Sequence, residues 1–249
     1  MTLEGRHALV TGGGQGIGLV VARTLTDTGA RVTVLGRRTE TLAAAITSGV
    51  AAAQVVADVT DAPALESALA ALPPVDILVN NAGAAESAPF ARTTHEIWDR
   101  MLAVNLTAVF TATRALLPGM LSRGWGRVVT IASTAGLIGY PYVSAYVAAK
   151  HGAIGLTRAL AREVAGKGVT VNAVCPGYTE TELVNSSIAR IAARGGRSAE
   201  AIRAEFTLAN PQGRLVQPQE VAAAVLYLCG PGSDAITGIS LPVAGGEVM

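Results

Sequence analysis

The chain has 249 residues, 50% of them hydrophobic, and a formal net charge of +1 at pH 7. It lacks the basic excess that binding to a nucleic-acid backbone requires, so we expect no nucleic-acid partner. It shows neither a signal peptide nor a run of about 18 apolar residues, and its two cysteines, Cys175 and Cys229, lie far apart without a histidine cluster. We therefore expect a cytoplasmic protein with no membrane span and no metal site.

Short runs rich in β-branched residues alternate with longer segments rich in alanine, leucine and arginine. The predicted strands are, in chain order, "HALVT", "RVTVL", "AAQVVA", "VDILVN", "RVVTIAS", "VTVNAV" and "SLPVA". Nearly every position in these runs is apolar, which is typical of strands buried on both faces of a parallel sheet. The alternation predicts an α/β fold with a doubly wound, parallel, seven-stranded, Rossmann-like sheet, helices on both faces, and ligands at the carboxyl ends of the strands. No linker interrupts the pattern, so we expect residues 1–249 to form a single domain.

The first predicted strand runs into the glycine-rich segment "TGGGQGIG", which an amphipathic helix follows. Gly12 permits a tight turn, Gly16 lets the backbone approach a pyrophosphate, and Gly18 lets the helix pack close to the sheet. The N–H groups at the helix start, near Gln15 and Ile17, can then bind phosphates. An ordinary glycine-rich turn is the alternative, which the position between a strand and a helix disfavours.

The spacing of this segment resembles the T-G-x-x-x-G-x-G motif of the short-chain dehydrogenase/reductase family. Two later segments, "ADVTD" and "VNNAG", also resemble that family. The resemblance implies that "ADVTD" contacts the adenine of a nicotinamide cofactor and that "VNNAG" flanks its ribose. The residues implied are Asp58, Val59, Asn81, Ala82 and Gly83.

The end of the second strand, "VLGRR", bears on the choice of cofactor. Gly36 stands where an NAD enzyme usually carries an acidic residue, and Arg37 and Arg38 follow it. Because an arginine can pair with a 2′-phosphate, we expect NADP(H) to be favoured over NAD(H). Two residues keep NAD(H) as an alternative cofactor. Gln15 stands at a position that is often basic in NADP-dependent relatives, and Glu40 is a second candidate ligand for the ribose.

The candidate chemistry centres on a tyrosine and a lysine four positions apart. Tyr146 and Lys150 share one face of a predicted helix. The positive charges of Lys150 and of oxidised nicotinamide are expected to lower the pKa of Tyr146 from about 10, and Lys150 can also donate to the ribose hydroxyls. Ser133, thirteen positions before Tyr146, ends the fifth strand and can hold a substrate oxygen.

Asn105 is a polar residue inside an apolar predicted helix, where asparagine is unfavourable. Together with Ser133, Tyr146 and Lys150 it resembles the catalytic tetrad of the short-chain dehydrogenase/reductase family. The resemblance implies that Asn105 anchors a water molecule in a proton relay to Lys150. A helix kink satisfied by water is the structural alternative, and it is compatible with that role.

The segment "CPGYTET" follows the sixth strand. In the family, the Pro-Gly loop packs against nicotinamide and a threonine beyond it bonds the carboxamide, which the resemblance transfers to Pro176, Gly177 and Thr179. Thr181 either shares this contact or caps the next helix. Cys175 is expected to be buried and inert.

Residues 181–213 form the most polar segment and read as helices around a Gly-Gly break, so we expect a mobile substrate lid. Its arginines either meet an anionic group, such as a 3-oxoacid or an acyl-coenzyme A thioester, or form a solvated face. They are Arg190, Arg194, Arg197 and Arg203. Near the end, "EVAAAVLYLCG" and "ITGISLPVAGGEVM" resemble the helix and strand through which the family pairs subunits, which predicts a homotetramer or homodimer.

These observations predict an oxidoreductase that transfers a hydride between NADP(H), or NAD(H), and a ketone/secondary-alcohol pair, with a 3-oxoacyl or 3-hydroxyacyl compound as one candidate substrate. A serine hydrolase is disfavoured because Ser133 lies outside a G-x-S-x-G motif. The alternative is a non-catalytic dinucleotide-binding sensor on the same fold, which a broken tetrad would favour.

Overall fold

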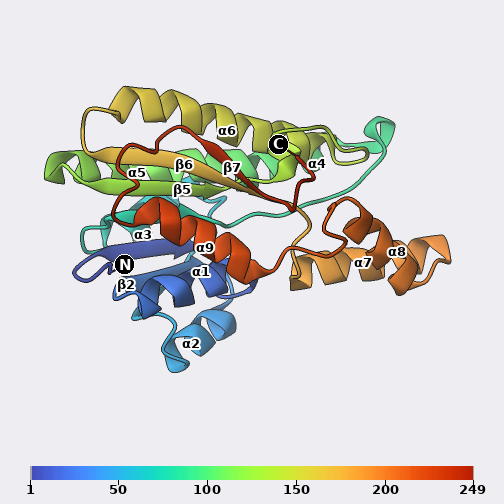
Figure 1. The fold of residues 1–249 in the computed structure, drawn as a ribbon, viewed down its shortest axis with the longest axis horizontal. Coiled ribbons are helices and arrows are strands. Elements are labelled where there is room, and N and C mark those ends of the chain that lie inside the picture. The colour runs from blue at the N-terminus through green and yellow to red at the C-terminus, as the bar shows by residue number, and fades with distance from the viewer. Residues whose placement is uncertain (1, 249) are drawn as a thin grey trace.

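The computed structural model describes residues 2–248, apart from the side chains of Leu183 and Arg194. Met1 and Met249, the ends of the predicted single domain, lie outside the described residues. The chain forms a parallel seven-stranded sheet in the order β3-β2-β1-β4-β5-β6-β7 (Figure 1). The strands are β1 (His7–Thr11), β2 (Arg31–Gly36), β3 (Ala53–Val56), β4 (Ile77–Asn80), β5 (Gly126–Ile131), β6 (Val169–Pro176) and β7 (Ser240–Val243). Each predicted strand is therefore confirmed.

The strand order reverses at β1, which pairs with β2 on one side and with β4 on the other. Every residue of β1, β4, β5 and β6 is buried, as the continuous apolar runs predict. A sheet that reverses its order opens a crevice at the carboxyl ends of the strands beside the reversal. The ligand site is thus expected at the ends of β1 and β4.

Helices cover both faces of the sheet. One buried cluster joins α1, α2 and α9 to one face, and a second joins α3, α5 and α6 to the other. In Figure 1, α1 and α9 lie on the lower side of the sheet and α6 on the upper side, while α7 and α8 lie beyond the strand ends at the right. The helices are α1 (Gly16–Asp27), α2 (Thr39–Thr47), α3 (Ala62–Ala70), α4 (His95–Leu102), α5 (Ala108–Arg123), α6 (Ser144–Val164), α7 (Glu182–Gly195), α8 (Ala199–Leu208) and α9 (Pro218–Cys229), with the short helical turns η1 (Phe90–Arg92), η2 (Ala103–Thr107) and η3 (Thr134–Gly136).

The elements α4, η2 and α5 form one continuous helical segment, His95–Arg123, and η2 is a π-helical turn within it. By length and composition alone this segment is apolar enough to cross a membrane. It packs against α3, α6 and the strands β4 and β5, however, as a core helix of an α/β layer does. Its apolar character is therefore explained by the fold.

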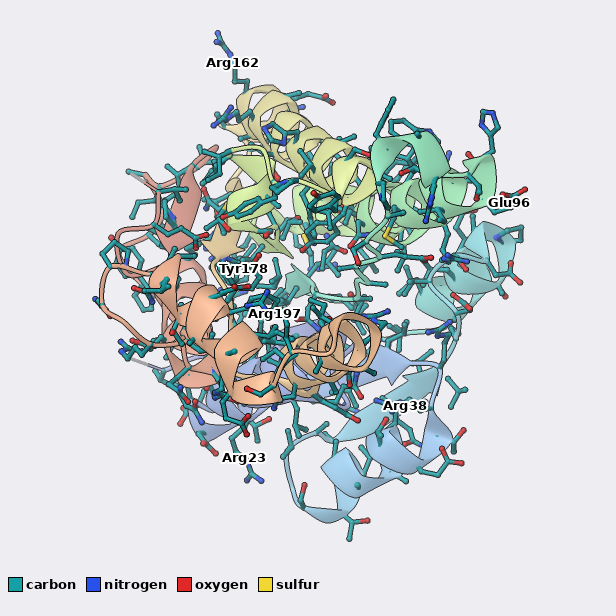
Figure 2. All side chains as sticks on the ribbon, turned by 90° about the vertical axis from the view of Figure 1, so that its right-hand side faces the viewer. Arg23, Arg38, Glu96, Arg162, Tyr178 and Arg197 are labelled. Carbon is teal, nitrogen blue, oxygen red and sulfur yellow. The ribbon has the colours of Figure 1, made fainter. Side chains whose placement is uncertain are left out.

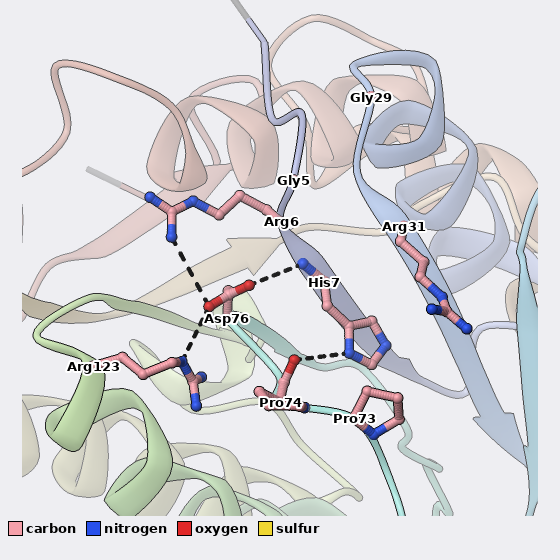
Figure 3. Close-up of a pocket in the computed structure, with 9 residues that line it drawn as sticks. All are labelled: Gly5, Arg6, His7, Gly29, Arg31, Pro73, Pro74, Asp76 and Arg123. Atoms are coloured by element: carbon pink, nitrogen blue, oxygen red, sulfur yellow. Dashed lines mark hydrogen bonds and ion pairs between the residues drawn. The ribbon is translucent and has the colours of Figure 1, made fainter.

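A cavity of about 410 Å³ lies at the amino-terminal edge of the sheet, opposite the strand ends that form the expected ligand site. Asp76 accepts a hydrogen bond from the His7 backbone at 3.0 Å and pairs with Arg6 at 3.9 Å and Arg123 at 3.5 Å (Figure 3). These contacts tie β1 and α5 to the residue that precedes β4. We interpret the charges of this cavity as a structural clamp.

Candidate active site

The predicted site residues converge at the carboxyl ends of β1, β4, β5 and β6. Figure 2 looks onto this edge: α7 and α8 cross in front of the strand ends, Tyr178 lies beside them, and Arg38 lies on the side of β2 and α2. Residues from separate parts of the chain thus meet in one region, because parallel strands end at the same edge of the sheet.

The glycine-rich turn after β1 is held to the segment after β4. Gly12 has a φ of +64°, a conformation that side chains disfavour. A Cβ at Gly18 would lie 2.4 Å from Asn81 Nδ2 and 2.4 Å from the Gly12 carbonyl oxygen, so only glycine fits there. Asn81 Nδ2 donates to the carbonyl oxygens of Thr11, at 2.9 Å, and Gly12, at 3.2 Å. The side chain of Asn81 therefore braces the turn, a structural role that is compatible with the predicted position of this residue beside the ribose.

The turn and the start of α1 fit the phosphates of a dinucleotide. Gln15 is the N-cap residue of α1, and its side chain makes no capping hydrogen bond. Gly16 has a φ of +52°, and a Cβ there would meet nothing closer than Thr181, at 3.6 Å. N–H groups without a side-chain cap, at the positive end of a helix dipole, suit an anion. Gln15, Gly16 and Ile17 are thus placed as the glycine motif predicts.

A cation and an anion face each other across the ends of β2 and β3. Arg37 Nη1 lies 3.5 Å from Asp58 Oδ2, and the Arg37 side chain is 74% exposed. Burial opposes ionisation of Asp58, but hydrogen bonds from Thr60 and the charge of Arg37 outweigh it and lower the pKa of the carboxyl group. Arg38 is exposed at the N-cap of α2, and Glu40 is exposed in the first turn of the same helix. Both arginines therefore border the region in which the adenosine end of a cofactor is expected.

The predicted Tyr146–Lys150 pair lies on α6 beside the end of β5. Lys150 is 5% exposed, and its Nζ donates to the Ile131 carbonyl oxygen at 2.8 Å. The same nitrogen lies 5.6 Å from the centre of the Tyr146 ring. Burial lowers the pKa of Lys150 to about 8. Lys150 is therefore poised to exchange its proton close to neutral pH.

The pKa of Tyr146 differs from the sequence-based expectation. Burial of the phenol raises this pKa, and a hydrogen bond with the Ser133 hydroxyl opposes the rise without cancelling it. Lys150 makes its hydrogen bond to the Ile131 backbone instead of to the phenol. The groups of the chain alone thus keep Tyr146 protonated at neutral pH, which is the state that a proton donor needs.

Asn105 lies in the π-helical turn η2 and is 1% exposed. Its Nδ2 donates to the carbonyl oxygens of Ala84, at 2.9 Å, and Met101, at 3.0 Å, and its Oδ1 accepts from the Ala84 N–H at 3.3 Å. A Cβ added to Gly83 would lie 2.9 Å from Asn105 Oδ1 and 3.7 Å from Lys150 Nζ. Asn105 and Lys150 therefore flank Gly83 in the "VNNAG" segment, and the π turn explains how an asparagine is accommodated within this helix.

The loop after β6 is held by its own threonines. Thr179 Oγ1 donates to the Gly177 carbonyl oxygen at 2.9 Å, and Thr181 accepts from the Val184 N–H at 3.4 Å as the N-cap of α7. The capping alternative for Thr181 is therefore what its side chain does here. Cys175 is fully buried, and burial raises the pKa of its thiol to about 11, in agreement with the expectation of an inert residue.

An aromatic wall beside these residues was not expected from the sequence. The Tyr178 ring stacks on Phe206 of α8 at 4.3 Å and meets Tyr140 edge-on at 6.3 Å. The Tyr140 hydroxyl hydrogen-bonds Thr134 Oγ1 at 2.8 Å and also bonds the carboxyl group of Glu247. Neither Tyr140 nor Tyr178 has a lysine four positions later in the sequence. The one sequence signal for this aromatic wall is that Tyr178 directly follows the Pro-Gly loop.

The two helices of residues 181–213 lie where a lid is expected, but two of their arginines already have carboxylate partners. Arg197 pairs with Glu205, and Arg203 pairs with Glu180 and also donates to Asn185 at 3.1 Å. Arg190 donates to Ser187 at 3.3 Å, and the side chain of Arg194 lies outside the described residues. Arg197 thus takes part in an ion pair within this segment and Arg203 in one with Glu180 just before it, and both side chains stay partly exposed, as on a solvated face.

Comparison with known proteins identifies the family. The short chain dehydrogenase family model matches residues 6–191. The chain is 39% identical to D-beta-hydroxybutyrate dehydrogenase of Rhizobium meliloti, covering 97% of this chain and 98% of that protein. It is 38% identical to 3-oxoacyl-(acyl-carrier-protein) reductase FabG of Vibrio harveyi over the whole of both chains. Among solved structures, a variant of actinorhodin polyketide ketoreductase with NADPH superimposes with a TM-score of 0.93 at 42% identity, covering 97% of each chain.

The chain therefore belongs to the short-chain dehydrogenase family. It is an NAD(P)-dependent oxidoreductase that acts on a ketone/secondary-alcohol pair, as the sequence predicts. The fold and the reaction class are thus confirmed, and the Ser133, Tyr146 and Lys150 side chains meet at the edge of the sheet where such a reaction would take place.

Proposed function

We propose that the protein is an NADP(H)-dependent ketoreductase of 3-oxoacyl thioesters, with Asn105, Ser133, Tyr146 and Lys150 as its catalytic group. The observation that carries the proposal is that the buried Lys150 lies 5.6 Å from the centre of the Tyr146 ring, with the Ser133 hydroxyl close enough to the Tyr146 phenol to influence its pKa. A ketone oxygen placed between the two hydroxyl groups would meet one group that holds it and one that can protonate it.

The bound nicotinamide would supply or accept the hydride at the substrate carbon. In reduction, Tyr146 gives its proton to the forming alkoxide while Ser133 donates a hydrogen bond to the same oxygen. Lys150, with a pKa of about 8, then returns a proton toward Tyr146 and binds the ribose hydroxyls. Asn105 keeps the Gly83–Ala84 backbone in place through its hydrogen bonds to Ala84.

The preference for NADP(H) rests on the end of β2. Gly36 offers no carboxylate to a ribose 2′-hydroxyl, and the exposed Arg37 and Arg38 offer two guanidinium groups to a 2′-phosphate. We expect kcat/KM to be at least about tenfold higher with NADPH than with NADH, which corresponds to about 1.4 kcal/mol. Arg37→Ala combined with Arg38→Ala should remove this preference, whereas Arg162→Ala, at an exposed position on α6, should not change it. A preference of the unchanged protein for NADH would contradict the proposal.

The proposed substrate class draws on relatives named as acyl-carrier-protein and polyketide ketoreductases. The aromatic wall of Tyr140, Tyr178 and Phe206 supports an acyl chain or ring as the group beside the reacting ketone. The test is a panel of 3-oxoacyl thioesters, simple ketones and 3-oxoacids assayed with both cofactors. Faster turnover of any other class than of the thioesters would refute this assignment, and binding of cofactor without any turnover would favour a sensor.

We further propose a cytoplasmic homotetramer or homodimer and a lid at residues 181–213. The exposed Tyr227 on α9 and the half-buried edge strand β7 support an interface at this side of the molecule. Light scattering that shows only monomers would exclude it.

A further inference from the structure

Glu247, near the C-terminus, places its side-chain carboxyl group beside the aromatic wall of the candidate active site. We propose that Glu247 is a specificity-determining residue that excludes substrates with a free carboxylate, so that the enzyme accepts only uncharged ketones such as esters and thioesters. This inference rests on the proposed ketoreductase site and deepens it by naming the charge that the site rejects.

Two glycines direct Glu247 into the site. Gly245 and Gly246 follow β7 with φ values of +60° and +96°, so the chain turns there in a way that other residues disfavour. A Cβ on Gly245 would lie 1.9 Å from Asn210 Oδ1, which leaves no room for a side chain. The turn then brings Glu247 Oε2 to 2.6 Å from the place of a Cβ on Gly177, in the Pro-Gly loop. The carboxyl group therefore lies against the loop that the family resemblance places on nicotinamide.

Among the described side chains, Glu247 has one hydrogen-bond partner, Tyr140, and no cation as an ion-pair partner. Tyr140 bonds Glu247 Oε1, whereas Oε2 is buried without a hydrogen-bond partner. Among the described residues, no arginine or lysine forms an ion pair with Glu247. An unpaired buried carboxylate oxygen favours a hydrogen-bond donor beside it and disfavours a second negative charge.

The charge of Glu247 affects the ionisation of a tyrosine beside the proposed site of the reacting ketone. Burial raises the pKa of Glu247, although the hydrogen bond from Tyr140 opposes the rise. Burial and the charge of Glu247 raise the pKa of Tyr178, and Tyr178 in turn contributes to the raised pKa of Tyr146. Tyr178 thus interacts electrostatically with both Glu247 and Tyr146, and its ring meets that of Tyr140, the residue that bonds Glu247. A substituent on a ketone held by Tyr146 would therefore come near Glu247.

Among the described lid arginines, Arg197 and Arg203 are paired with Glu205 and Glu180, and Arg190 donates to Ser187, so none of the three is engaged with Glu247. A substrate carboxylate about 5 Å from Glu247, at an effective dielectric constant of about 20, would bind on the order of a hundredfold more weakly than its neutral ester. The loss arises from repulsion alone, so it should vanish when the charge of Glu247 is removed.

The test compares the unchanged protein with Glu247→Gln, and uses Glu163→Gln, at an exposed position on α6, as the control. Each protein is loaded with the reduced cofactor that it binds more tightly, and cofactor fluorescence is titrated at pH 8 with 3-hydroxybutyrate or with its ethyl ester. These alcohols form a complex with reduced cofactor that cannot react. Binding is therefore measured without turnover.

We expect the unchanged protein and Glu163→Gln to bind the ester about a hundredfold more tightly than the acid. Glu247→Gln should bind the acid at least tenfold more tightly than the unchanged protein does, with ester binding unaltered, which also shows that the variant is folded. Equal binding of acid and ester by the unchanged protein, no gain for the acid in Glu247→Gln, or loss of ester binding in that variant would overturn the assignment. Failure to reduce 3-oxoacyl thioesters would refute the proposed function and leave this result in place.

Discussion

Replacing Lys150 by methionine should abolish turnover and alter how stability depends on pH. Methionine keeps the length of the side chain and removes its charge. Lys150 is buried with a pKa of about 8, against an ordinary value of 10.5. Because the folded state holds this proton less tightly than the unfolded state does, burial of the charged amine destabilises the fold below pH 8.

The magnitude follows from the two pKa values. The gap between about 8 and 10.5 corresponds to about 3 kcal/mol of destabilisation when the amine is fully protonated in both states. As the pH rises from 8 to 10.5, the folded state releases the proton first and this penalty disappears. The stability of the unchanged protein relative to Lys150→Met should therefore rise by about 2 kcal/mol between pH 7 and pH 9.5.

The assay is denaturant unfolding of both proteins at a series of pH values, followed by circular dichroism. The variant lacks the hydrogen bond from Lys150 to Ile131 at every pH. The test is therefore how the difference in unfolding free energy between the two proteins changes with pH, and the absolute size of that difference is not used. Cys229 titrates in both proteins and cancels, and Cys175, whose pKa the charge of Lys150 lowers, titrates at about 11, above the pH range of the comparison. Lys167→Met, at an exposed lysine, should show no such dependence. A difference that stays constant within about 0.5 kcal/mol, or that changes in the opposite direction, would refute the reasoning.

Three further outcomes are expected. Tyr146→Phe should lower kcat by about 10² to 10⁴-fold while cofactor affinity, measured by fluorescence titration, stays nearly the same; unchanged turnover would exclude Tyr146 as the proton donor. Gly18→Ala should weaken cofactor binding at least about tenfold, because the new Cβ would lie 2.4 Å from Asn81 Nδ2. The control is Gly155→Ala, whose Cβ would have no atom within 4 Å, and it should stabilise α6 by about 0.5 to 1 kcal/mol. Phe206→Ala should raise KM about three- to tenfold by removing the stack on Tyr178, with kcat little altered, and an unchanged KM would show that α8 does not shape the substrate site.

Much of the fold could be predicted because its signals are local. A strand buried on both faces needs apolar residues at nearly every position, so the runs from "HALVT" to "SLPVA" mark the strands without reference to their neighbours. The glycines of the first turn are likewise required by backbone geometry, as the φ of +64° at Gly12 shows. Parallel strands end at one edge, so residues at strand ends, such as Ser133, could be placed together from the sequence.

The ionisation of the site could not be predicted in the same way. A spacing of four residues correctly places Tyr146 and Lys150 on one face of α6, but it says nothing about how far water is excluded from them. Burial raises one pKa and lowers the other, and the lysine bonds a backbone carbonyl of β5. The predicted lowering of the Tyr146 pKa by Lys150 is therefore not a property of the chain alone.

By itself, the sequence determined the order of strands and helices, the glycine turn and the residue types of the candidate tetrad, because each depends on neighbours a few positions away. Only the tertiary structure decided that Arg197 and Arg203 pair with Glu205 and Glu180 and that Glu247 lies against Gly177. Glu247 and Gly177 are 70 positions apart in the chain, and even the arginine pairs depend on how the turns between their partners fold. The strength of a charge interaction depends on how far packing excludes water from it, which no short stretch of sequence shows.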